Sequence, residues 1–134
     1  MMLASRAVPE PLRTDSLDRL LQEMADEIAG VRVLVVGDRN GLPLGAYSKG
    51  TRSMAATAVA TLIVTAGQDL ARTLELKEFS DVLVEGPTWK VFVRLLAGGF
   101  TLMGVLEGEV NLGMVRLAVG RRVPQIEASL AAFS

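Results

Sequence analysis

The sequence predicts an α/β fold in which a five-stranded antiparallel sheet has helices on both faces. Three observations lead to this prediction. Three segments repeat apolar residues at helical spacing, whereas five short segments are rich in valine and other strand-forming residues. Short connections with turn residues join the last three strands, so these strands are expected to pair as an antiparallel meander. Apolar side chains alternate onto both sides of the last two strands, so both faces of the sheet need a covering layer.

The predicted order of elements is α-β-β-α-β-β-β-α. The first helix has leucines at helical spacing on one side and acidic residues on the other, and Gly30 suits the left-handed residue after its end. Asn40-Gly41 separates the first two strands and is typical of tight hairpins, because both residues tolerate positive φ. The expected helices span 14–29, 51–76 and 111 onward, and the expected strands span 31–37, 42–48, 81–85, 89–96 and 100–107.

The last helix contains a proline in its interior. Asn111 is a suitable cap at the start of this helix, and a stripe of apolar residues follows at helical spacing. Pro124 removes the backbone hydrogen bond to Gly120, so a kink or a break is expected near Val123. With three helices for two sheet faces, the economical arrangement is a three-layer sandwich with two helices on one face and one on the other.

The chain is expected to be one domain with a flexible start. Pro9 and Pro11 are expected to prevent a helix at the beginning, so residues 1–13 are predicted to be a flexible tail. Residues 14–134 contain no internal repeat and no linker, and they are predicted to form a single domain.

The composition excludes several classes of function. The 134 residues include neither Cys nor His, which excludes disulfides, thiolate chemistry, the usual zinc sites and every Ser-His catalytic pair. The chain has 14 Lys and Arg against 15 Asp and Glu, so it has no strong positive field for nucleic acid. The longest uncharged stretch, 53–68, is too short and too polar to insert into a membrane. We therefore expect a cytoplasmic protein that binds neither nucleic acid nor the membrane interior.

The central helix predicts a dimer. Between Arg52 and Asp69 it carries no charged side chain around its circumference, and such a helix is normally buried on all sides. One sheet covers only one side of a helix, and the many small residues let a second backbone approach closely. A second copy of the chain, or a relative with the same fold, is expected to pack here. The predicted interface residues on this helix are Met54, Ala55, Ala58, Thr61, Leu62 and Thr65.

The ordered set of segments resembles the Roadblock family, the superfamily of dynein light chains and bacterial GTPase regulators. The likeness begins with the valine-rich strand, the turn and the second strand of the first hairpin, and continues through the alanine-rich helix to the start of the last helix. It covers roughly residues 15–130. The matching segments are GVRVLVV (30–36), DRNGLPL (38–44), MAATAVA (54–60), DVLVEG (81–86) and NLGMVR (111–116).

The resemblance implies a three-layer sandwich like those of the Roadblock, longin and profilin folds. It also implies a dimer formed through the central helix and the edge of the third strand, which adds Val82 and Val84 to the predicted interface. Such dimers are non-enzymatic platforms, and bacterial members are often partnered with small Ras-like GTPases. The resemblance transfers no catalytic residue and no cofactor, because the family has no shared active-site motif.

The motifs of nucleotide and metal sites are missing. Lys49-Gly50-Thr51 lacks the preceding glycine of a phosphate-binding loop, so the chain is not expected to be a GTPase itself. Asp38 and Asn40 have the spacing that opens a calcium loop, but the later ligands are absent and a tight turn is the better interpretation. No catalytic, cofactor-binding or metal-binding residue is predicted.

Two arginines are candidates for contact with a partner. Arg39 lies at the tip of the predicted hairpin, and Arg52 precedes the central helix. An arginine supplied to a GTPase stabilises charge on the transferred phosphoryl group and is worth roughly 10³ to 10⁵ in rate. Arg39, Asn40 and Arg52 are the predicted partner-binding residues, although arginines in turns and at helix ends most often only make the surface soluble.

Three functional hypotheses follow. The first is a homodimeric Roadblock-type module that binds and regulates a small Ras-like GTPase. The alternative is a structural scaffold subunit that assembles with related Roadblock-type proteins. The third is a sensory module with a small ligand between sheet and helix, although few buried polar groups are available to orient a ligand.

Overall fold

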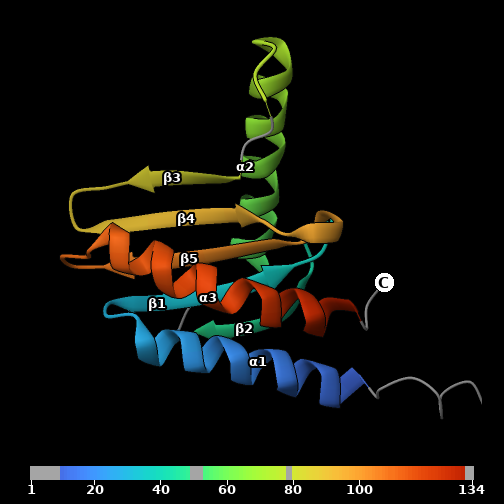
Figure 1. Ribbon diagram of the computed structural model, residues 1–134, viewed down its shortest axis with the longest axis vertical. Helices are drawn as coiled ribbons and strands as arrows, with labels where there is room; N and C mark the ends of the chain where they lie inside the picture. The colour runs from blue at the N-terminus through green and yellow to red at the C-terminus, as the bar shows by residue number, and fades with distance from the viewer. Residues whose placement is uncertain (1–9, 49–52, 78–79, 132–134) are drawn as a thin grey trace, which may run out of the picture.

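The protein folds as a three-layer sandwich. The computed structural model describes residues 10–48, 53–77 and 80–131. Two helices lie on one face of a five-stranded antiparallel sheet and one helix lies on the other, as predicted (Figure 1). The strand order is β2-β1-β5-β4-β3. The elements are α1 (Glu10–Glu27), β1 (Val31–Gly37), β2 (Pro43–Ser48), α2 (Ser53–Thr73), β3 (Asp81–Glu85), β4 (Trp89–Leu95), a 3₁₀ turn η2 (Ala97–Gly99), β5 (Thr101–Glu107) and α3 (Leu112–Leu130).

The sheet separates two apolar cores. Leu34 and Val36 of β1 belong to the core shared with α1 and α3, whereas Val33 and Val35 belong to the core shared with α2. All four side chains are at most 1% exposed, which explains why β1 has no alternation of apolar and polar residues. The predicted faces of β4 and β5 are confirmed, since each strand contributes apolar residues to both cores.

The two edge strands of the sheet differ in how their outer sides are covered. Leu17 of α1 packs so closely on β2 that a Cβ atom at Gly45 would lie 2.6 Å from Leu17 Cγ. The Asp18 carboxylate accepts a hydrogen bond of 2.8 Å from the backbone N–H of Ala46. Helix α1 therefore covers the β2 edge. At the other end of the sheet, β3 has no backbone partner on its outer side within residues 10–48, 53–77 and 80–131.

Both predictions about proline need correction. Helix α1 begins at Glu10, not at residue 14, because Pro11 lies in the first turn, where its missing N–H would have no helical partner anyway. Helix α3 continues through Pro124, so of the expected kink or break near Val123 the break is wrong. Its apolar side chains are buried on both sides of the proline, and this packing outweighs the lost hydrogen bond.

The first hairpin turn also differs from the prediction. Only Gly41 has a positive φ, of 83°, and Asn40 does not. The Asp38 carboxylate instead accepts hydrogen bonds from the backbone N–H groups of Asn40 (2.8 Å) and Leu42 (3.0 Å). The turn is thus stabilised by a side chain next to it, and β2 begins one residue later than expected, at Pro43.

Arg122 links the two helices on the same face of the sheet. It donates hydrogen bonds from Nε to Glu27 (2.7 Å) and from Nη1 to Glu23 (3.0 Å), both on α1. The hydrogen bond to Glu27 is the main cause that raises the pKa of the Arg122 guanidinium above its ordinary value. One guanidinium between two carboxylates forms a small network, which is worth more than an isolated surface pair.

Replacing Arg122 with alanine is expected to lower the free energy of unfolding by about 1 kcal/mol, because two carboxylates lose a shared partner. Arg72→Ala is the matched control, since it removes an exposed pair with Asp69 within α2. The free energy of unfolding of this control is expected to fall by less than about 0.5 kcal/mol. Urea unfolding followed by circular dichroism measures both values, and equal losses would contradict a linking role for Arg122.

Candidate functional site

Helix α2 has a broad apolar face that its own sheet does not cover. Ala60 and Val64 are buried against the sheet, whereas Leu62 is 69% exposed and Val59 is 53% exposed. The C-terminal part of the helix extends past β3 in Figure 1. Three more leucines are exposed in and after this part, namely Leu70, Leu74 and Leu76. Contiguous exposed apolar surface of this kind is typical of an interaction site.

The predicted interface residues differ in what they already contact. Ala58, Leu62 and Thr65 are exposed, and Val84 on β3 is 39% exposed. Val82 is half-buried and lies on the sheet face that α2 covers.

The remaining three predicted interface residues also belong to α2. Thr61 is half-buried, because the hairpin turn of the same chain lies against it: a Cβ atom at Gly41 would lie 3.1 Å from Thr61 Oγ1. The side chains of Met54 and Ala55 lie outside the part of the chain that is described.

The predicted partner-binding residues do not form one cluster. Arg39 donates a hydrogen bond of 2.8 Å from Nε to the carbonyl oxygen of Gly98, and its side chain lies against Gly99. It therefore fastens the β1–β2 turn to the turn before β5. Asn40 is exposed beside it, and Arg52 falls outside the described residues. An open cavity of about 220 Å³ adjoins Arg39, between the sheet and α2.

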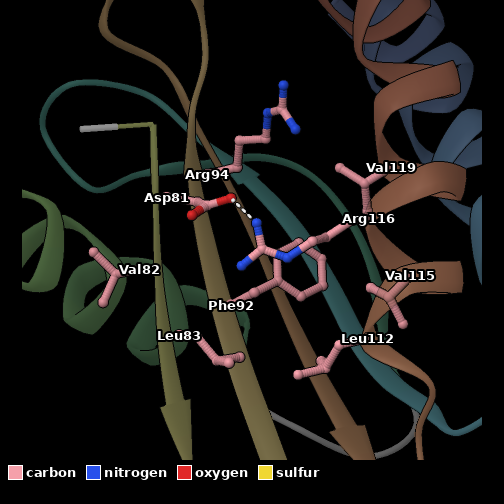
Figure 2. Close-up of a pocket in the computed structure, with 9 residues that line it drawn as sticks. All are labelled: Asp81, Val82, Leu83, Phe92, Arg94, Leu112, Val115, Arg116 and Val119. Carbon is pink, nitrogen blue, oxygen red and sulfur yellow. Dashed lines mark hydrogen bonds and ion pairs between the residues drawn. The ribbon is translucent and has the colours of Figure 1, made fainter. Parts of the chain in front are cut away.

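A groove lies on the opposite face of the sheet, between α3 and the strands β3 and β4 (Figure 2). Leu83 and Phe92 are directly paired across β3 and β4, and Leu112 of α3 lies on the other side of the groove. Arg116 reaches from α3 to Asp81 on β3, with an Nη1–Oδ2 distance of 3.4 Å. This groove was not predicted from the sequence. The signal was present as Phe92 between Lys90 and Arg94 on one face of β4.

Gly104 positions the aromatic ring in the groove. It lies opposite Phe92 on the neighbouring strand β5, and a Cβ atom at Gly104 would lie 2.2 Å from Phe92 Cε1. The absence of a side chain thus lets the phenyl ring lie flat across β5, an arrangement known to stabilise glycine within sheets.

Comparison with solved structures gives the same architecture. A structure of MglB in a tetrameric arrangement superposes with a TM-score of 0.78 at 20% identity, covering 87% of this chain and 89% of that one. The gliding protein MglB of Thermus thermophilus gives 0.76 at 22% identity, covering 91% and 93%. A Roadblock/LC7 domain of Streptomyces avermitilis gives 0.72 at 16% identity, covering 87% and 95%. The chain has the Roadblock fold. No family model and no curated protein matches the sequence.

The described part of this Roadblock fold offers surfaces for binding. Among the described residues, no three acidic side chains lie close enough together to hold a metal ion, and no helix is long and apolar enough to cross a membrane. The exposed face of α2 and the groove beside α3 lie on opposite faces of the sheet.

Gly104→Ala is expected to lower the free energy of unfolding by about 1–3 kcal/mol, because the new methyl group displaces Phe92. Gly120→Ala in α3 is the matched control, since a Cβ atom at this position would have nothing within 4 Å. The free energy of unfolding of this control is expected to rise by about 0.5–1 kcal/mol, because alanine has a higher helix propensity than glycine. Thermal and urea unfolding measure both variants, and a neutral Gly104→Ala would show that the ring does not depend on the glycine.

Proposed function

We propose that this protein is a non-enzymatic, homodimeric Roadblock-type module of the cytoplasm that binds a small Ras-like GTPase and regulates it. The observation that carries the proposal is the uncovered apolar face of α2, which includes Leu62 at 69% exposure. A soluble protein rarely keeps such a face in water. The likeness to structures of MglB and of a Roadblock/LC7 domain supports an interaction role for this fold.

The edge of β3 supports the same dimer. Of the two edge strands, β2 is covered by α1, whereas β3 is open along its outer side in the described part of the chain. Val84 on β3 is exposed and lies on the sheet face that α2 covers. A two-fold arrangement that pairs β3 with its copy and packs α2 against its copy removes both the open edge and the exposed leucines from water.

The GTPase partner is supported by the resemblance of the sequence to the bacterial branch of the Roadblock family. A platform of this kind acts by positioning the switch loops of the GTPase, without supplying a catalytic group. Arg39 fits this role, because its Nε is already held by the carbonyl oxygen of Gly98.

A scaffold role is the second candidate function. One similar structure is of MglB in a tetrameric arrangement, which supports assembly of this fold beyond two copies. In that case the same α2 face would bind related Roadblock-type proteins, and no GTPase would be required.

Leu62→Asp is expected to weaken the dimer by more than about 100-fold, because it buries a carboxylate without a partner at the interface. Leu117→Asp is the matched control: Leu117 is 56% exposed on α3, away from the proposed interface, and this variant should remain dimeric. Sedimentation equilibrium measures both dissociation constants. If both variants weaken the dimer equally, or if neither does, the interface lies elsewhere.

Arg39→Ala is expected to change stimulated GTP hydrolysis by less than about threefold, because the module positions the GTPase's own groups. The assay mixes the protein with each small Ras-like GTPase of its source organism, loaded with GTP, and follows phosphate release. A loss of roughly 10³-fold or more would instead make Arg39 an arginine supplied in trans. Absence of binding to every GTPase tested, in either nucleotide state, would favour the scaffold role.

A further inference from the structure

We propose that the groove between α3 and the β3–β4 strands binds an acidic, amphipathic segment of a partner protein. An apolar side chain of that segment would lie against Leu83 and Leu112, and a carboxylate would pair with Arg94. The inference adds a second binding surface to the proposed interaction role, and it rests on that role. It requires neither the dimer nor a GTPase, because α3, β3 and β4 of one chain form the whole groove.

The floor and wall of the groove are apolar. Leu83 and Phe92 form a cross-strand pair on the sheet face that carries α3, and both side chains are only half-buried. Leu112 is half-buried on the opposite wall, and Val115 is buried next to it (Figure 2). Helix α3 covers the middle of the sheet and leaves this strip of β3 and β4 uncovered. The free space between the two walls is only about 30 Å³, so a bound segment would lie on the surface of the strip, with its apolar side chains against Leu83 and Leu112.

The charges around the groove do not balance. Asp81 is engaged by Arg116 at 3.4 Å, and Glu85 lies 3.9 Å from Lys90 at the other end. Arg94 is half-buried and lies directly across from Asp81, yet it has no ion pair or hydrogen bond with any described residue. One guanidinium is therefore left without a partner among the described residues, at the end of the strip and on the far side of the Arg116–Asp81 pair from Leu83 and Leu112 (Figure 2).

This surplus charge favours an acidic occupant. A guanidinium binds a carboxylate through two parallel hydrogen bonds, and the interaction is stronger where the pair is partly shielded from water. A basic segment would be repelled by Arg94 and Arg116, and a purely apolar one would leave Arg94 without a partner and further desolvated. The favoured segment has leucine or phenylalanine three or four residues from aspartate or glutamate, so that both lie on one side of a helix.

The test is selection from a random 12-residue peptide library displayed on phage, with the full-length protein as bait. Enriched peptides should combine apolar and acidic residues. Their affinity, measured by fluorescence polarisation with the labelled peptide, should fall at least tenfold for Arg94→Glu and remain unchanged for the control Arg19→Glu on α1. In NMR titration with the same peptide, the backbone amides of Leu83, Phe92 and Leu112 should shift.

Other outcomes overturn the proposal. These are no enrichment, enrichment of basic or purely apolar peptides, equal affinity for Arg94→Glu, or amide shifts confined to α2. If the charge-reversal variant Arg94→Glu does not fold, Arg94→Gln replaces it, because this change removes the charge without reversing it. The Leu62→Asp monomer should bind the peptide as tightly as the wild-type protein. The experiments thus distinguish a wrong prediction of the dimer from a wrong prediction of peptide binding in the groove.

Discussion

Covering both faces of one small sheet is the constraint from which the rest of the structure follows. Strand β1 is apolar on both sides, so water must be excluded from two faces. Two helices, tied together by Arg122, share the first face, whereas among the described residues α2 alone covers the second face. A single helix has two sides, and only one of them meets the sheet. The apolar residues on the other side of α2 remain in contact with water unless a second molecule covers them.

The two surfaces proposed for interaction arise from the same arrangement. Because α1 and α3 are placed toward β2 and the middle of the sheet, no described residue covers the β3 end on its edge or on the α3 side. The open edge and the face of α2 suit a copy of the chain. The groove on the α3 side contains Arg94, which has no ion-pair partner in the described part of the chain, and suits a different occupant. A dimer built on α2 would therefore leave two grooves free for partners.

Much of the fold could be predicted because it depends on local patterns. The five strands, their antiparallel pairing and the side on which Phe92 and Val93 lie all follow from spacing along the chain. The errors concern positions where distant contacts decide. Burial of the neighbouring side chains holds α3 together across Pro124, and the missing N–H of Pro11 costs nothing in the first helical turn. The groove was missed because its two walls are distant in sequence and are brought together by the packing of α3 and the Arg116–Asp81 pair.

The solution mass of the wild-type protein tests the central claim most directly. Light scattering after gel filtration, over a range of micromolar concentrations, gives the mass independently of shape. We predict twice the chain mass of 14.3 kDa, about 28.6 kDa, because two α2 faces cover each other. A mass of 14.3 kDa at every concentration would contradict this claim, and would mean that the exposed leucines of α2 are tolerated in water.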